Sequence, residues 1–169
     1  MFYVPLYHFT VSDWNIKQRL FEIYQRTNLL LTGNVHTDYH DTPNYQHEVR
    51  EIFEHELNIF FEDVNERYDV TDAWFETSLK RNHHPVHDHG SFGFSAVYYL
   101  KYDSEHHTPT HFISPFRTYD LRGNMDSYMQ YKPRDIMEGS LIIFPANILH
   151  YTLPNNSDTE RIILSFNLK

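Results

Sequence analysis

The sequence of 169 residues has no cysteine and only 14 basic side chains against 23 acidic ones. The absence of cysteine excludes disulfides, thiolate metal sites and cysteine nucleophiles, so any metal ion must rest on nitrogen and oxygen ligands. The formal net charge of -9 disfavours a broad basic face for nucleic acid, so we do not expect nucleic acid as a partner.

A long apolar run is also missing. The chain opens MFYVPLYHF, without a basic stretch that leads into such a run. The sequence therefore predicts neither a signal peptide nor a membrane span. We expect a soluble protein of the cytoplasm, or of the host cytoplasm if the source is a phage. The length suits a single domain over 1–169, and neither an internal repeat nor a low-complexity segment is present.

The N-terminal part, 1–70, has helical patterning. We expect a short edge strand over 2–9, because that run contains a proline, and then a helix over 14–26 that Ser12 or Asp13 caps. The polar stretch 32–44 predicts a loop. A longer helix is expected from Asn44 to about Tyr68, where apolar side chains recur at spacings of three and four: Val49, Ile52, Phe53, Leu57, Phe60, Phe61 and Val64.

After Asp72 the apolar period changes to two, which is typical of strands. Six strands are expected, at 73–81, 95–102, 110–116, 140–145, 149–153 and 161–168. A polar loop is expected over 118–135. Helices followed by many short strands predict a mainly β protein with α, in which 71–169 form a sandwich or barrel and the helices pack on one sheet.

Histidine is abundant, with 13 residues, so only placement can identify ligands. His87 and His89 are two positions apart ahead of a predicted strand, and on an extended segment both would point the same way. His150 would add a third imidazole from another strand, where it shares a face with Thr152. Three ligands on one side of an ion leave positions for substrate and oxygen, as in non-haem Fe(II) oxygenases.

Arg161 lies on the next predicted strand and alternates with apolar residues so that it faces the same cavity as His150. A buried arginine needs a counter-charge, and its planar fork matches a carboxylate. A dicarboxylate cosubstrate with one end on the metal and the other on Arg161 is therefore a natural candidate. Ser165, on the same face, could add a hydroxyl contact.

These residues resemble the 2-oxoglutarate/Fe(II)-dependent oxygenases, whose core is a double-stranded β-helix or jelly roll. The motifs are H-x-H, S-x-V-Y-Y-L, L-x-x-F-P-x-x-x-x-H and R-I-x-x-S-F-N, and the likeness covers roughly 80–168. More narrowly, the chain resembles a small family of such oxygenases from bacteria and phages. The resemblance implies a hydroxylase that uses Fe(II), 2-oxoglutarate and O2 on an unidentified substrate, either a protein side chain or a small molecule.

By this resemblance His87, His89 and His150 would bind the metal, and Arg161 the far carboxylate of 2-oxoglutarate. Either Tyr98 or Tyr99 would donate a hydroxyl to that cosubstrate. The usual second ligand of these enzymes is a carboxylate two positions after the first histidine, where this chain has His89. Asp88 lies one position early, so a three-histidine site and a site completed by Asp88 are both open.

Two other functions fit part of the pattern. Gly139, Pro145, His150 and Asn155 approximate the second motif of cupins, and His87-x-His89 resembles the first, so a cupin-like three-histidine metalloenzyme without 2-oxoglutarate is one alternative. The other is a non-catalytic jelly-roll binding or virion protein with a relict site.

Overall fold

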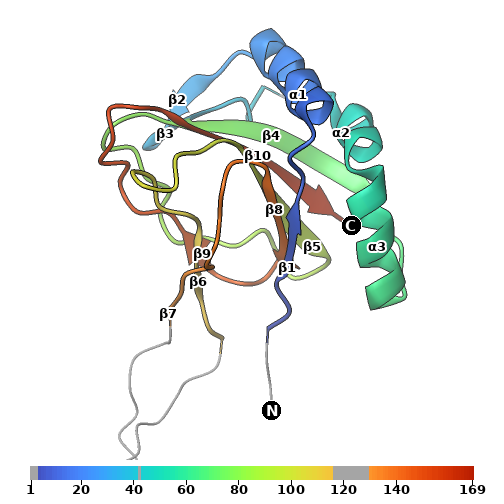
Figure 1. Ribbon diagram of the computed structural model, residues 1–169. Coiled ribbons are helices and arrows are strands. Elements are labelled where there is room, and N and C mark those ends of the chain that lie inside the picture. Colours follow the sequence, from blue (N-terminus) through green and yellow to red (C-terminus); the bar gives the residue numbers. More distant parts are fainter. Residues whose placement is uncertain (1–3, 42, 116–129) are drawn as a thin grey trace, which may run out of the picture.

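Two antiparallel sheets form the body of the protein (Figure 1). The computed structural model describes residues 4–41, 43–115 and 130–169. Within these residues the larger sheet has the strand order β1-β8-β5-β10-β4-β3-β2. Its strands are β1 Tyr7–Thr10, β2 Leu30–Thr32, β3 Val35–Thr37, β4 Val70–Ser78, β5 Phe94–Lys101, β8 Ser140–Pro145 and β10 Arg161–Leu168. The smaller sheet has the order β7-β6-β9, from β6 His111–Ile113, β7 Gln130–Tyr131 and β9 His150–Tyr151.

The helices α1 Trp14–Arg26, α2 Gln46–Ile52 and α3 Glu54–Val64 lie together along one side of the larger sheet (Figure 1). Asp13 is the residue that caps α1, since its side chain accepts a hydrogen bond from the amide of Asn15 at 2.8 Å. The single long helix expected up to Tyr68 is instead divided at Phe53. It ends at Asn65, which takes the left-handed conformation (φ 54) common at helix C-termini.

Strand β10 separates two cores. Its even-numbered residues Ile162, Leu164, Phe166 and Leu168 pack against the helices, as their alternation predicted. Its odd-numbered residues face the smaller sheet, where Ile163 joins an apolar cluster with Val97, Tyr99, Phe112, Ile142, Phe144 and Ile148. The mainly β double-stranded β-helix with helices on one sheet is confirmed.

The N-terminal part is not only helical. It contributes β1, β2 and β3 to the larger sheet, and β1 is an edge strand, as the proline in its segment indicated. The loop expected over 32–44 is wrong in part, because β2 and β3 form a hairpin there with a two-residue turn. Gly33 takes the first turn position with φ 60, which glycine adopts without strain.

Strands β6 and β9 are shorter than the segments 110–116 and 149–153 that were expected. Most of the loop expected over 118–135 falls outside the described residues, and β7 lies within its last part. None of the described helices is long and apolar enough to cross a membrane.

Candidate metal centre

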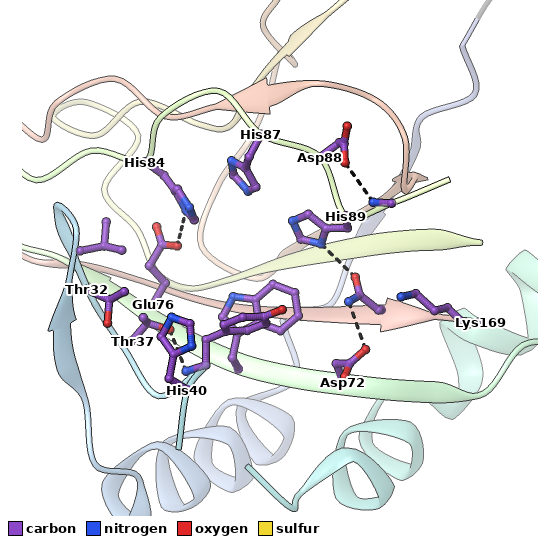
Figure 2. A pocket seen from close by; sticks show the side chains of 15 residues that line it. Thr32, Thr37, His40, Asp72, Glu76, His84, His87, Asp88, His89 and Lys169 are labelled. Carbon is purple, nitrogen blue, oxygen red and sulfur yellow. Dashed lines mark hydrogen bonds and ion pairs between the residues drawn. The ribbon is translucent and has the colours of Figure 1, made fainter. Parts of the chain in front are cut away.

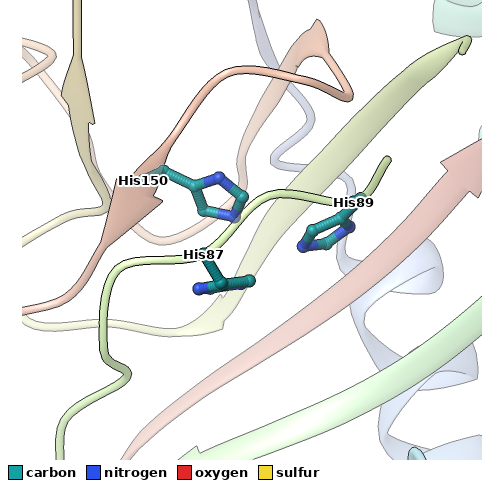
Figure 3. Close-up of side chains that lie close together, drawn as sticks. All are labelled: His87, His89 and His150. Atoms are coloured by element: carbon teal, nitrogen blue, oxygen red, sulfur yellow. The ribbon is translucent and has the colours of Figure 1, made fainter. Parts of the chain in front are cut away.

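Backbone pairing sets two of the predicted ligands opposite each other. The His87 amide donates to the carbonyl of His150 at 3.0 Å, and the His150 amide donates to the carbonyl of His87 at 2.9 Å. Side chains of directly opposed residues lie close together, and these two rings are 4.3 Å apart between centroids. His89, whose amide donates to the carbonyl of Ala146 at 2.8 Å, completes the group. The potential ligand atoms of the three histidines all lie within 4.8 Å of one another (Figure 3).

Each of the three rings is oriented by an oxygen that faces its Nδ1 atom. The acceptors are the carbonyl of Pro85 for His87 at 2.8 Å, the carbonyl of Ile148 for His150 at 2.9 Å, and the side-chain oxygen of Asn167 for His89 at 2.9 Å. Nδ1 must carry the proton to donate these bonds, which leaves Nε2 with a free lone pair. Outer hydrogen bonds of this kind fix the tautomer and direction of metal-binding histidines. The donor set therefore fits a divalent first-row metal ion.

The three imidazoles are held neutral. Burial, followed by the electrostatic effect of His84, lowers the pKa of His87 to about 4. Burial and then His87 lower the pKa of His150 to about 2, and burial also lowers the pKa of His89. Neutral imidazole is the form that binds a metal, so the site needs no deprotonation at neutral pH.

Asp88 is not a member of this group. Its side chain is exposed and accepts a hydrogen bond from the amide of Gly90 at 3.1 Å (Figure 2). The alternative in which Asp88 replaces His89 as a ligand is not supported, because among the described residues only the three histidines converge.

Arg161 is 3% exposed and lies inside the barrel, on the site face of β10. Its Nη1 donates to the carbonyl of Thr108 at 2.9 Å. Its Nε and Nη2 have no hydrogen-bond partner in the described part of the chain. Two buried donors without acceptors are costly, so this guanidinium retains its capacity to bind a carboxylate.

Glu76 of β4 is the charged group next to Arg161. On the paired strands Ser78 opposes Arg161 and Glu76 opposes Ile163, so Glu76 and Arg161 are diagonal neighbours within reach of long side chains. Glu76 Oε1 lies 3.7 Å from Arg161 Nη2, and its Oε2 lies 2.8 Å from His84 Nδ1. Burial raises the pKa of Glu76, but the hydrogen bond from His84 and the charges of His84 and Arg161 outweigh it and leave the pKa lowered.

Two cavities meet at the histidines. The outer cavity, of about 560 Å³, opens beside His87 and His89, and its walls include Tyr39 and Asp72 (Figure 2). The inner cavity, of about 20 Å³, lies between the histidines and the site face of the sheet and is lined by Val97, Thr110, His150, Thr152, Ile163 and Ser165. Five residues line both: Trp74, Glu76, His84, His87 and His89.

The model of a family described as "Putative 2OG-Fe(II) oxygenase" matches residues 72–167. The chain belongs to the 2OG-Fe(II) oxygenase family. The family's cofactor is Fe(II) and its cosubstrate is 2-oxoglutarate, and the three grouped histidines and the buried arginine fit both. None of the curated proteins matches it in sequence.

Solved structures share the oxygenase's fold at low sequence identity. An oxidoreductase of the 2OG-Fe(II) oxygenase family from Burkholderia pseudomallei has a TM-score of 0.70 and 12% identity, over 97% of this chain and 84% of that one. A prolyl-4-hydroxylase from Pseudomonas putida has a TM-score of 0.65 and 14% identity, over 98% and 92%. HygX from Streptomyces hygroscopicus, solved with nickel, 2-oxoglutarate and hygromycin B, has a TM-score of 0.67 and 11% identity, over 98% and 82%.

The two candidate tyrosines lie on opposite faces of β5. Tyr98 packs in the helix-side core and donates to the carbonyl of Val11 at 3.0 Å, so it is not available to the site. Tyr99 is on the site side, where its hydroxyl bonds the side chain of Thr110 at 3.2 Å. Burial raises the pKa of Tyr99, which keeps this hydroxyl protonated. Ser165 is buried and lines the inner cavity.

Sequence reasoning missed Glu76, His84 and Asn167. The sequence did offer an indication for Glu76. It shares a face of its strand with Trp74, whereas Ala73 and Phe75 on the other face are apolar and pack on the helix side. Asn167 lies on the same face of β10 as Arg161, but nothing local indicated that its side-chain oxygen would accept a hydrogen bond from His89. Of the cupin-like pattern, His87, His89 and His150 come together, whereas Asn155 does not join them: its side chain donates to the carbonyls of Ser78 and Thr159, both at 2.9 Å.

Proposed function

We propose that this oxygenase hydroxylates its substrate with Fe(II) held by His87, His89 and His150 and with 2-oxoglutarate anchored by Arg161. The observation that supports this most strongly is the pairing of two features inside one barrel. Three neutral imidazoles, whose Nδ1 atoms are all occupied by hydrogen bonds, have possible ligand atoms within 4.8 Å of one another, and a buried guanidinium nearby has two donors without acceptors in the described part of the chain.

Each residue has a separate role in this proposal. The three imidazoles bind and orient the metal, and Arg161 neutralises the far carboxylate of 2-oxoglutarate through its free donors. Ser165, which lines the inner cavity, and Tyr99 are the hydroxyls we assign to the cosubstrate. The surrounding apolar side chains exclude water, which strengthens these polar contacts. When bound, the iron and 2-oxoglutarate would supply the oxidising chemistry together with O2, one oxygen atom of which would enter the substrate hydroxyl and the other the succinate that forms as 2-oxoglutarate loses CO2.

The substrate is assigned to the outer cavity, because His87 and His89 form part of its wall. Its size fits one side chain or one small molecule. The prolyl-4-hydroxylase and HygX with hygromycin B indicate that this fold serves both kinds of substrate, so the substrate class stays open between them. A cytoplasmic location and the single domain over 1–169 remain predictions.

An anaerobic titration with Fe(II) and 2-oxoglutarate tests the proposal through the visible metal-to-ligand charge-transfer band. We expect the band in the wild type and its loss in Arg161→Ala and in His150→Ala. Circular dichroism melts establish that each variant is folded. A wild type that binds Fe(II) but shows no band, and releases no succinate once O2 is admitted, would favour the cupin-like alternative. A wild type that binds no divalent metal would favour the non-catalytic one.

A further inference from the structure

A pair of side chains from the protein itself occupies the space between the metal centre and Arg161. The His84 ring stacks on His87, with 3.9 Å between centroids and 16° between planes. His84 Nδ1 lies 2.8 Å from Glu76 Oε2, and Glu76 Oε1 lies 3.7 Å from Arg161 Nη2. A continuous series of contacts therefore runs from a metal-binding histidine to the proposed anchor of the cosubstrate, with His84 and Glu76 as its middle members. Figure 2 shows the first three members of the series, His87, His84 and Glu76.

The contact between Glu76 and Arg161 is incomplete. At 3.7 Å the two atoms are too far apart for a hydrogen bond. Neither Glu76 Oε1 nor Arg161 Nη2 has another partner in the parts of the chain that the structure describes. Both side chains are almost wholly buried, with 3% and 4% exposed. The carboxylate offsets the charge of Arg161 without saturating its donors, because His84 holds the other carboxylate oxygen.

The inner cavity is too small for the cosubstrate. Its volume of about 20 Å³ is enough for roughly one water molecule, whereas a five-carbon dicarboxylate is several times larger. Glu76 and His84 line both this cavity and the outer one, so they form part of the wall between the two. A ligand that reaches from the metal to Arg161 must displace this pair.

We propose that Glu76 is a positioning residue that acts as an internal substitute for the far carboxylate of 2-oxoglutarate. In the cosubstrate-free protein it supplies the counter-charge for Arg161, and it must withdraw when 2-oxoglutarate binds. His84 keeps Glu76 short of a full ion pair and so keeps Arg161 ready for exchange. This inference rests on the proposed function, since it requires that Arg161 bind the cosubstrate.

Calorimetric titration of 2-oxoglutarate into the Mn(II)-loaded protein, in which no turnover is needed, tests the competition. Glu76→Gln keeps the shape and the hydrogen bond to His84 but removes the charge. Because like charges beside one guanidinium oppose each other, we expect 2-oxoglutarate to bind about tenfold more tightly to this variant. The gain must be absent for 2-oxopentanoate, which has no second carboxylate to place at Arg161.

Two further variants sharpen the test. Glu160→Gln makes the same charge change next to Arg161 in sequence, but Glu160 pairs at the surface with Lys101 at 2.9 Å, so the affinity should stay at the wild-type value. His84→Phe keeps an aromatic ring on His87 and releases Glu76 to close on Arg161. This variant should bind 2-oxoglutarate several-fold more weakly, and the double variant with Glu76→Gln should recover the tight binding.

Equal or weaker binding of 2-oxoglutarate by Glu76→Gln, with a wild type that binds it, would overturn the inference and leave the proposed function standing. Should Glu76→Gln fail to fold, the His84→Phe variant decides, because tighter or unchanged binding there contradicts the proposal. If the Mn(II)-loaded wild type itself does not bind 2-oxoglutarate, the proposed function fails instead.

Discussion

The two faces of β10 are equally buried, but one packs on the helices and the other faces the candidate site. All eight residues of the strand are buried. On the helix side they are apolar, and Phe166 stacks on Phe53 with 5.6 Å between centroids. On the other side Arg161, Ser165 and Asn167 are polar: Arg161 lies beside Glu76, Ser165 lines the inner cavity, and Asn167 accepts a hydrogen bond from His89. Burial alone therefore does not distinguish a structural residue from a functional one; the partners of the buried polar atoms do.

Two buried carboxylates show the same contrast. Asp38 on the helix side accepts from the amide of Phe75 at 2.8 Å and from the hydroxyl of Tyr45 at 2.7 Å, so both of its oxygens are bonded. Glu76 on the site side has one oxygen without a hydrogen bond, beside Arg161. A carboxylate whose bonds are complete holds elements together, whereas one left incomplete next to a cation marks the place where another ligand can enter.

The largest effect is expected from a cavity on the helix side. Phe166→Ala should lower the free energy of unfolding by about 3–5 kcal/mol, because the ring of Phe166 is fully buried and a cavity would replace it. Urea denaturation measures the loss, and the metal affinity of the folded variant should not change. Ile59→Ala on α3, where the side chain is 45% exposed, is the control and should change stability by less than about 0.5 kcal/mol. A loss as small as that control's would contradict the assignment of Phe166 to the core.

Much of the site side could be predicted from local patterns. The alternation in RIILSFN placed Arg161 and Ser165 on one face, and the structure agrees. His150 and Thr152 were expected on a common face, and both line the inner cavity. These predictions succeed because the period of a strand is fixed by the backbone and does not depend on what packs against it.

The features that could not be predicted from the sequence depend on contacts between distant segments. In SAVYYL both faces are largely apolar, so the period could not indicate whether Tyr98 or Tyr99 faces the site; the docking of the helices decides it. The hairpin of β2 and β3 was not predicted because it lies in a polar stretch. Within the sheet it is joined only to β4, through β3. The contact of Glu76 with Arg161 requires the register of two strands far apart in sequence.

A smaller effect is expected from the residue that orients His89. Asn167→Ala removes the acceptor for Nδ1 of His89 and should weaken Zn(II) binding by about 10- to 100-fold, the usual cost of losing such an outer hydrogen bond. Asn167→Asp retains an acceptor and should restore most of the affinity, as measured by calorimetry. Asn58→Ala on α3 serves as the control. If Asn167→Ala and Asn167→Asp bind Zn(II) equally, the orienting role is wrong.

The smallest effect concerns the pH dependence of Asp38. Burial raises its pKa by more than the bonds from Tyr45 and Phe75 lower it, so the folded protein binds this proton more tightly than the unfolded chain does. Its contribution to stability is therefore present at low pH and is lost as pH rises through the folded pKa. Compared with Asp38→Asn, the wild type should gain stability as pH falls from 7 toward 4, by at most about 1.4 kcal/mol for each unit of pKa shift. Asp158→Asn should show the opposite sign, because the hydrogen bond from Lys80 lowers the pKa of Asp158.

Chemical denaturation of the wild type and the two variants across this pH range measures both trends. If the stability advantage of the wild type over Asp38→Asn does not grow as the pH falls, Asp38 does not bind its proton more tightly in the folded protein.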